Sequence, residues 1–355
     1  MKFSAIWRES VRNTKTGTAR AGTFAVLLAA VMGGAVAADL HTVVQISAEG
    51  ERFRNSGAAT YTMAAAARID GNACERLADI EGIVDAGALR HSQAHVITTT
   101  LRTSPIATFE VTPLFPALLG ATTTGAGPLA GPELVETLGP SARATIETLA
   151  GPIQVGGTYR YPADGRRAGF GYALLEPVTS TGLFDECWVN IWPSQDDLSQ
   201  LLFSTLREGT DSQQSPELSQ LNTSHGSEFN GAELLKGRIT RLAAPVCASV
   251  GVLLGMVAVR LRRVQIASAL HAGVSRRSQI LMLNLEAIAW ALPAAVLATA
   301  AALALERQAL PDVKAVLLLL AVRATCAGAL GVLSGTTFAV ALVRESHLFR
   351  YFKTR

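Results

Sequence analysis

Four long apolar stretches constrain the fold of this 355-residue chain more than any other feature. They cover residues 21–38, 242–259, 281–305 and 315–343. A helix needs about 17–25 apolar residues to cross the hydrocarbon core of a bilayer, and each stretch reaches that length. Only 17% of the residues are charged, against about 25% in soluble domains. The sequence therefore predicts a polytopic membrane protein and argues against a nucleic-acid-binding protein.

The predicted fold class is an α-helical domain with four membrane spans plus a separate α+β domain. The expected segments, in chain order, are an interfacial amphipathic helix (1–20), the first span (21–38), the α+β domain (39–240), the second span (241–260), a cytoplasmic helix (261–280), the third span (281–305), a short external loop (306–314), the fourth span (315–343) and a cytoplasmic tail (344–355). The interfacial helix is expected because Phe3, Ile6, Trp7 and Val11 recur at helical spacing among basic residues.

The distribution of basic residues predicts how the spans are oriented. Residues 1–20, 260–277 and 344–355 are rich in Lys and Arg and nearly free of acidic residues. Short segments of this kind stay on the cytoplasmic side, so we expect both termini inside the cell membrane and the α+β domain outside. One alternative stays open, in which Ala35-Val36-Ala37 is the cleavage site of a signal peptide rather than part of a retained anchor.

Local patterns in the α+β domain predict a mixture of strands and helices. Apolar runs at residues 83–90 and 94–101 are typical of strands. Residues 73–80 are typical of a short helix with Asp70 or Asn72 as its cap. Residues 210–231 are polar and rich in Ser, Gln and Asn, which predicts a mobile stalk that returns to the membrane.

The four cysteines divide between the two predicted environments. Cys247 and Cys326 lie inside spans, where we expect packing thiols. Cys74 and Cys187 both lie in the external domain, where an oxidising compartment permits a disulfide. The alternative is a pair of unrelated buried thiols.

No pattern in the sequence is typical of an active site. The Gly-rich phosphate loop and the Gly-x-Ser-x-Gly turn of hydrolases are both missing. His91 and His95 are four residues apart, but they fall in a strand–turn region, and we interpret them as solvated side chains rather than metal ligands. The sequence therefore predicts a protein that is not an enzyme and holds no metal.

Small residues within the spans predict close helix packing. Gly251 and Gly255 form a Gly-x-x-x-Gly face, and Gly331 and Gly335 repeat this spacing in the fourth span. Such faces let helix backbones approach one another.

Two ionisable side chains lie within the later spans, and intramembrane charges are functional candidates. Glu286 begins near the basic cytoplasmic end, so we expect it to snorkel or to pair there. Arg323 lies nearer the outer end and needs a partner or a water-filled site.

The connection between the second and third spans carries a family resemblance. It begins Arg262-Arg263-Val264-Gln265-Ile266-Ala267 and ends Gly273-Val274-Ser275-Arg276-Arg277-Ser278-Gln279-Ile280. This segment resembles the short cytoplasmic helix of MacB/FtsX-type (type VII) ABC transporter permeases. It departs from their pattern in having Gln265 where an acidic residue is usual and Val274 in place of a small alanine. The order of the predicted segments is also similar to that family along the whole chain.

The resemblance implies a mechanism called mechanotransmission. Two permease chains, identical or different, would pair, each docked on a cytoplasmic ABC ATPase that binds the ATP and Mg²⁺, so no cofactor is expected in this chain. ATP-driven movement would pass through the spans to the external domains. The resemblance implies that each external domain has two porter-like βαβ halves, 74–89 and 187–208, with a β-rich insertion between them. A Cys74–Cys187 bridge would join the two halves. The residues implied in ATPase coupling are Gln265, Ile266, Ala267, Gly273, Ser275, Arg276 and Arg277. For the two arginines, anchoring by the positive-inside rule is the simpler alternative.

Three functions compete on these grounds. The leading one is a permease that exports or extracts a hydrophobic, peptide or lipid-like substrate and contacts membrane lipid. The second is an FtsX-like signalling module that activates an extracytoplasmic protein such as a cell-wall hydrolase. The third is a membrane receptor without an ATPase.

Overall fold

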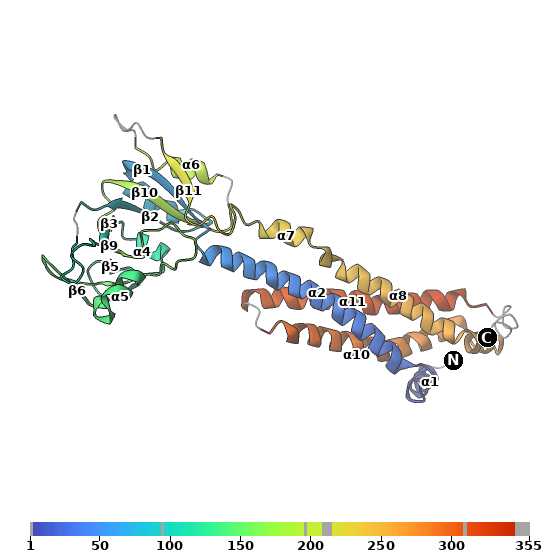
Figure 1. Cartoon of the computed structure of the whole chain (residues 1–355). Helices are drawn as coiled ribbons and strands as arrows, with labels where there is room; N and C mark the ends of the chain where they lie inside the picture. The colour runs from blue at the N-terminus through green and yellow to red at the C-terminus, as the bar shows by residue number, and fades with distance from the viewer. Residues whose placement is uncertain (1–2, 94–95, 195–196, 208–214, 308–310, 345–355) are drawn as a thin grey trace. The chain divides into compact units, whose positions relative to one another are not determined.

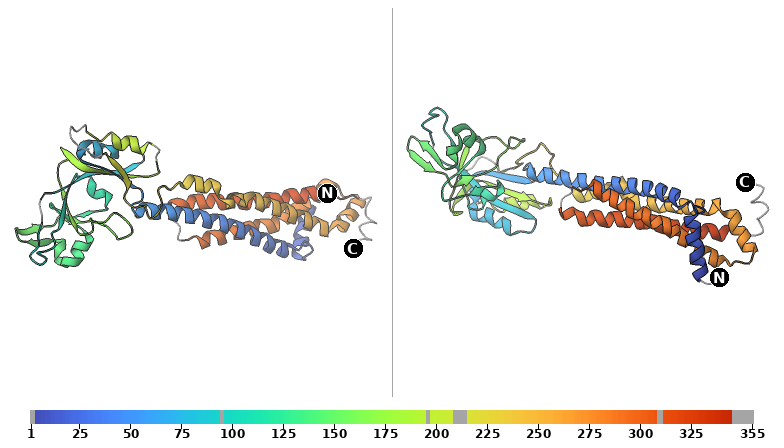
Figure 2. Two further views of the ribbon diagram at one scale, coloured as in Figure 1. Left: turned by 45° about the horizontal axis from the view of Figure 1, so that its top comes forward. Right: turned by 90° about the horizontal axis from the view of Figure 1, so that it is seen from below.

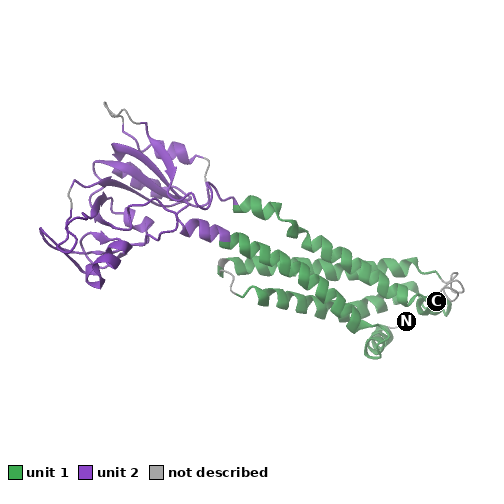
Figure 3. Ribbon diagram, viewed as in Figure 1, with its two compact units in different colours: residues 1–48, 231–355 green, residues 49–230 purple. Residues whose placement is uncertain are grey.

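The computed structural model describes residues 3–93, 96–194, 197–207, 215–307 and 311–344 (Figure 1). The chain divides into two compact units, shown in different colours in Figure 3. Residues 1–48 and 231–355 form the first, which we call the helix bundle, and residues 49–230 form the second, which we call the sheet domain.

The described part of the chain contains four helices that are long and apolar enough to cross a membrane. Their apolar segments are Ala21–Asn55, Ile239–Leu261, Arg276–Leu305 and Val313–Leu342. The prediction of four apolar helices is confirmed, and such a set fits a multi-pass membrane protein.

In chain order the helices of the bundle are α1 (Phe3–Lys15), α2 (Ala21–Asn55), α7 (Gly231–Gly237), α8 (Ala243–Leu261), α9 (Arg263–His271), α10 (Arg276–Leu305) and α11 (Pro311–Leu342). The four long helices of the bundle, α2, α8, α10 and α11, run alongside one another in every view (Figures 1 and 2). The short helix α1 instead crosses the end of the bundle and packs against α10 (Figure 2).

Helix α2 extends much further than the first span predicted from the sequence. It does not end at residue 38 but continues to Asn55. Residues 39–55 are more polar and carry no span signal, yet they hold the helical conformation because nothing in them breaks it: Pro is absent and Gly50 is the single glycine. The sheet domain therefore begins on a helix, not on a strand.

Among the described residues, nine strands form one sheet in the order β11-β1-β10-β2-β3-β9-β5-β8-β4. The strands are β1 (Thr60–Asp70), β2 (Ile83–His91), β3 (Ala107–Val111), β4 (Thr122–Thr123), β5 (Leu129–Ala130), β8 (Gly157–Thr158), β9 (Ala173–Pro177), β10 (Leu183–Ile191) and β11 (Glu217–Gln220). A separate hairpin joins β6 (Thr145–Thr148) to β7 (Gly151–Gln154). The short helices of this domain are α3 (Gly71–Arg76), α4 (Phe115–Leu118), α5 (Pro132–Leu138) and α6 (Leu198–Phe203).

The first four strands of that order form two interleaved β-α-β units. β1 and β2 both pair antiparallel with β10, which lies between them, and α3 connects them along the chain. In the same way β10 and β11 both flank β1, and α6 lies between them in sequence. This is the split arrangement in which a strand of one unit fills the gap of the other. The prediction of an α+β domain is confirmed.

Several predicted elements differ from the observed ones. The strand expected at 94–101 begins outside the described residues, and from Val96 onward the chain makes isolated bridges, while the strand β3 lies further on at Ala107–Val111. The stalk expected at 210–231 also begins outside the described residues, and its later part holds the edge strand β11. The cap of α3 is as expected, because the Asp70 carboxylate accepts a hydrogen bond from the amide of Ala73.

Alternation along β10 places its side chains in two cores. Cys187 and Val189 face the core that α3 and α6 cover, whereas Trp188 faces the opposite core between the rings of Phe115 and Phe170. The predicted disulfide between Cys74 of α3 and Cys187 of β10 is present, with the two Cα atoms 5.8 Å apart.

Candidate functional site

The segment expected to contact an ATPase forms a short helix followed by the first turn of a long one. After α9, Gly273 adopts a φ of +86°, a left-handed conformation that glycine reaches without strain. Ser275 then caps α10, because its side chain accepts a hydrogen bond from the amide of Ser278. Gly273 and Ser275 thus fix the reversal of the chain between two helices.

Two of the residues implied in coupling face inward. Ile266 and Ala267 are 3% and 0% exposed, and they pack with Val259, Leu283 and Val340. Their side chains hold α9 against the bundle and are not available to a partner. The sequence motif alone does not show which of its residues are buried, because helix α9 has one buried and one exposed face.

Arg276 has a local structural role at the end of α11. Its guanidinium donates hydrogen bonds to the carbonyl oxygens of Ala341, at 3.1 Å, and Val343, at 3.2 Å. A cation near the last carbonyls of a helix stabilises them and complements the helix dipole. Among the residues implied in coupling, Gln265 and Arg277 have exposed side chains that do not cap or brace a helix end. Gln265 accepts a hydrogen bond from Arg262 at 3.1 Å.

A buried polar cluster joins three elements behind this connection. Glu286 of α10 is 3% exposed and accepts a hydrogen bond at 2.8 Å from Asn13 of α1. It also forms an ion pair with Arg262, which lies between α8 and α9. Glu286 is therefore paired at the basic end of the bundle, as the sequence led us to expect. Asn13 was not predicted, because the amphipathic pattern of α1 pointed to its apolar side chains.

Helix α1 has one face buried against the bundle and one face that carries exposed aromatic side chains. Ile6, Ser10 and Asn13, spaced by one helical turn, lie buried, whereas Phe3 is 61% and Trp7 52% exposed. The exposed aromatic side chains are the ones that an interfacial helix would place in lipid.

The glycines singled out in the spans lie where α8 and α11 meet. A Cβ at Gly251 would strike the backbone of Gly328, and one at Gly255 would strike the backbone of Val332. From the other side, Gly331 contacts Ala248 and Gly335 contacts Val252. Backbone approach of this kind requires glycine on both helices.

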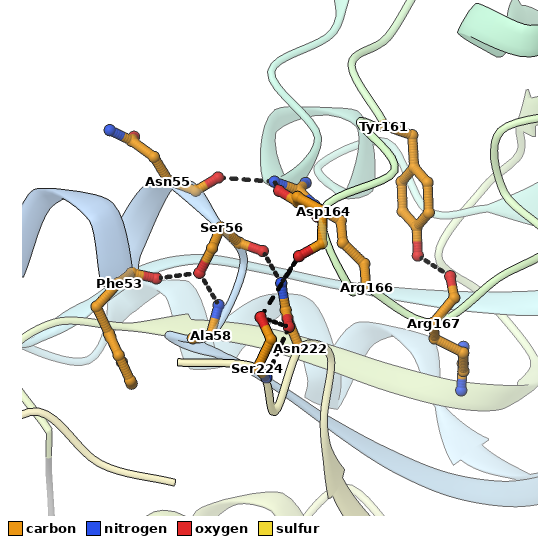
Figure 4. A network of polar contacts seen from close by, with 10 residues as sticks. All are labelled: Phe53, Asn55, Ser56, Ala58, Tyr161, Asp164, Arg166, Arg167, Asn222 and Ser224. Atoms are coloured by element: carbon orange, nitrogen blue, oxygen red, sulfur yellow. Dashed lines mark hydrogen bonds and ion pairs between the residues drawn. The ribbon is translucent and has the colours of Figure 1, made fainter. Parts of the chain in front are cut away.

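A second set of polar contacts lies where α2 ends in the sheet domain (Figure 4). We call it the junction network, and its members are Asn55, Ser56, Asp164, Arg166, Asn222 and Ser224. The Asn222 amide is 1% exposed and donates to the carbonyl oxygens of Ser56, at 2.9 Å, and Asp164, at 3.1 Å. Arg166 pairs with Asp164 at 2.9 Å and donates to the carbonyl oxygen of Asn55 at 2.7 Å. The network joins three segments that are distant in sequence.

Burial also changes the chemistry of a tyrosine beside this network. Tyr161 donates its hydroxyl hydrogen to the carbonyl oxygen of Arg167 at 2.5 Å (Figure 4). Desolvation raises the pKa of Tyr161 to about 12, although the cations of Arg167 and Arg166 act in the opposite direction. Tyr161 therefore stays a neutral hydrogen-bond donor at physiological pH.

An aromatic cluster packs next to the same helix end. The rings of Phe53, Trp192 and Phe229 lie with their centroids 5.7–6.4 Å apart. Gly50 leaves room for them, because a Cβ there would lie 3.0 Å from the Phe229 ring. Together with the junction network, this cluster holds the last turns of α2 to the segments that precede α6 and α7.

The polar and aromatic clusters described above join helices and strands of the fold. Within the described ranges, no three or more His, Cys, Asp or Glu side chains gather in a way that could hold a metal ion. His95 lies outside the described residues, and the ring of His91 packs at a tilt of 50° against the ring of Phe109, with centroids 4.7 Å apart.

Comparisons with known proteins add two distant likenesses. No protein-family model and no curated protein matches the chain. Among solved structures it is similar to the periplasmic region of MacB from Actinobacillus actinomycetemcomitans, with 11% identity and a TM-score of 0.28 over 42% of this chain and 83% of the other. It is also similar to a domain of a candidate permease protein from Porphyromonas gingivalis, with 12% identity and a TM-score of 0.30 over 50% and 95%. Both scores are low, and the chain's own residues carry the functional argument.

Proposed function

We propose that this chain is the permease subunit of an ABC-type transporter, which passes movement from a cytoplasmic ATPase to the sheet domain. The observation that carries the proposal is the continuity of α2, a single helix from Ala21 in the bundle to Asn55 in the junction network. A helix is a stiff spacer, so a displacement of its first turns reaches its last turn. A flexible linker would lose that displacement.

The α9 connection supplies a surface for the ATPase. Gln265, Ser268 and Arg277 are exposed, while Ile266 and Ala267 fix the opposite face of the helix in the bundle. The Glu286 cluster links this connection to α1 and α10. A force on α9 is therefore applied to packed helices instead of being absorbed by a loose loop.

The resemblance of residues 262–280 supports the remaining parts of the proposal. These are cytoplasmic termini, a second permease chain, two ATPase copies that bind ATP and Mg²⁺, and a hydrophobic, peptide or lipid-like substrate. Each follows from the family that the segment resembles, and the exposed basic face of the connection suits an acidic groove on a partner.

Co-purification tests the proposal directly. The tagged full-length protein is extracted from its own membranes in a mild detergent, and the eluate is assayed for ATPase activity and for co-eluting chains. The test variant carries Ser268→Glu and Arg277→Glu, both on the exposed face of the connection. The matched control carries Arg307→Glu, an exposed arginine between α10 and α11.

We expect an ABC ATPase to co-elute with the wild type and with the Arg307→Glu control, and to be lost from the double variant. Arg276 is left unchanged because its contacts to α11 would confound binding with stability. Folded wild-type protein that brings down no ATPase contradicts the proposal. An ATPase that the double variant retains would contradict the placement of its contact surface on α9.

A further inference from the structure

A hollow lined by basic and apolar residues opens on the bundle at the level where α8 begins. It has a volume of about 490 Å³ and is lined by residues of α2, α7, α8, α11 and the turn before α8. Its cations are Lys236, Arg238, Arg241 and Arg323, and its carboxylate is Asp39. We call it the basic hollow.

The carboxylate that lines the hollow is already paired with a cation. Asp39 pairs with Arg238 at 2.9 Å, and the two side chains are 8% and 14% exposed. Arg238 also donates a hydrogen bond to the carbonyl oxygen of Leu235. This buried pair forms one side of the hollow. Because its two charges cancel, Lys236, Arg241 and Arg323 set the net charge of the hollow.

The other three cations face the hollow without an acidic partner. Among the described residues, no ion pair joins Lys236, Arg241 or Arg323 to a carboxylate. Arg241 donates one hydrogen bond, to the carbonyl oxygen of Lys236 at 2.6 Å. Arg323 interrupts the apolar helix α11, where an uncompensated charge is costly unless a ligand or water meets it. The hollow is therefore built for an anion.

Helix geometry gives the depth of the hollow in a bilayer. From the basic end of α8 at Arg260, Ala243 is about 26 Å away at 1.5 Å per residue. From Ala21 at the start of α2, Asp39 is about 27 Å away by the same rule. Since the hydrocarbon core is about 30 Å thick, the hollow lies at the opposite boundary of that core, where lipid phosphates are found.

Apolar residues complete the site. Leu242, Pro245 and Leu320 line the hollow beside the cations, and neighbouring side chains such as Leu319 and Val246 are 68% and 46% exposed on the helix surfaces. A ligand that fits has an anionic head for the arginines and a hydrocarbon part for the leucines. Arginine is suited to such a head because its planar guanidinium can form two charge-assisted hydrogen bonds with a phosphate.

We propose that the basic hollow binds the phosphate group of an anionic phospholipid from the leaflet opposite the basic ends of the spans. Arg323 and Arg241 hold the phosphate, and the acyl chains lie over Leu242 and Leu320. The proposal requires only that the four helices span a bilayer, so it stands or fails independently of any ATPase.

The test titrates the purified full-length protein in detergent with three probes by calorimetry. They are dihexanoyl phosphatidylglycerol, dihexanoyl phosphatidylcholine and inorganic phosphate. We expect phosphatidylglycerol to bind about tenfold or more tightly than either of the others, because it alone combines a net negative charge with acyl chains. Equal binding of the two lipids would overturn the proposal, and binding of free phosphate as tight as that of the anionic lipid would overturn the assignment to a lipid.

Variants locate the site. Arg323→Gln and, separately, Arg241→Gln should each weaken phosphatidylglycerol binding about tenfold or more, since each removes a charge-assisted contact. Arg307→Gln is the matched control, because Arg307 is exposed on the same side of the bundle but does not line the hollow, and it should leave binding unchanged. Thermal midpoints equal to that of the wild type show that the variants are folded. Unchanged lipid binding in both hollow variants would overturn the proposal.

Discussion

Where α8 and α11 meet in the helix bundle, facing backbones approach across glycine and alanine, whereas in the sheet domain large aromatic side chains fill much of the core. Ala287, Ala291, Ala294 and Ala298 supply much of the buried face of α10, and Gly331 touches the backbone of α8. The sheet domain instead buries Trp188, Phe115 and Phe184 completely, together with a disulfide. The two regions of one chain thus follow different packing rules.

The difference reflects the solvent that each region meets. Lipid is as apolar as a leucine side chain, so helices in a membrane associate through close backbone contact and a few polar pairs. A domain in water gains about 25 cal/mol per Å² of buried apolar surface, which rewards large side chains. Polar contacts in the bundle are consequently few and specific, as at Glu286, and their loss should be felt strongly.

The first prediction concerns that buried cluster and is the largest effect we expect. Glu286→Ala leaves Arg262 buried without its partner, which costs about 3–5 kcal/mol. Thermal unfolding of the purified protein in detergent measures the loss. Asn13→Ala is the companion variant and should cost about 1.5–3 kcal/mol, because it removes one hydrogen bond to the Glu286 carboxylate and leaves the ion pair in place. A wild-type midpoint for Glu286→Ala would show that the cluster does not stabilise the bundle.

The second prediction separates the two regions. Replacing Cys74 and Cys187 together by Ser removes a crosslink between positions 113 residues apart, at a cost of about 2–5 kcal/mol to the sheet domain. Hydrogen exchange resolved along the chain should show lost protection in β1 and β10 and unchanged protection in α8 and α11. Cys326→Ser, at an exposed cysteine of α11, is the control. Equal loss of protection in the bundle would mean that the two regions do not unfold separately.

The third prediction addresses close packing in the bundle. Gly331→Leu forces a side chain into the backbone of Ala248, and such overpacking costs about 1–3 kcal/mol. Gly34→Leu is the matched control in α2, because nothing lies within 4 Å of the Cβ that it adds. The comparison of their thermal midpoints checks the claim. Equal midpoints for the two variants would contradict the assignment of Gly331 to a helix contact.

The fourth prediction is a small pH effect in the sheet domain. Desolvation opposes ionisation of Asp70, but hydrogen bonds from Arg207 and from the amide of Ala73 outweigh it, so the pKa of this carboxyl lies below its ordinary value. The resulting stabilisation is complete above the unfolded pKa, about 3.9, and is lost as the pH falls through the lower folded pKa.

Asp70→Asn keeps the helix cap but removes this charge. We expect a loss of less than about 1 kcal/mol at neutral pH, because the Arg207 side chain of the pair is exposed. The difference from the wild type should vanish in acid, as denaturant unfolding across the pH range would show. A difference that persists below the folded pKa would mean that the charge is not its cause.

The features that could be predicted are those whose signal extends over many residues of the sequence. The apolar helices could be predicted because about 20 consecutive residues all carry the same information. The disulfide needed only an oxidising compartment and two cysteines in one domain. The extension of α2 to Asn55 could not be predicted, because residues 39–55 carry neither a span signal nor a stop signal.

The sheet domain and the candidate site were harder because their signals are short or depend on distant partners. β3 and β11 span five and four residues, and pairing with β9 and β1 decides them. The sequence drew attention to the 262–280 segment but did not distinguish Ile266, which faces the bundle, from Gln265, which faces outward. The roles of Asn13 and Arg276 depend on contacts to residues 273 and 65 or more positions away.

The burial of Asn222 has a practical consequence for producing the protein. Asn222-Thr223-Ser224 is a sequon for N-linked glycosylation, and such sites normally lie on exposed loops. In the folded domain both amide hydrogens of Asn222 are engaged, and the side chain is inaccessible to a transferase. A sugar found at Asn222 after production in a glycosylating host would therefore mark molecules that were modified before the junction network closed. Its mass shift would count the chains that were modified before folding, without any activity assay.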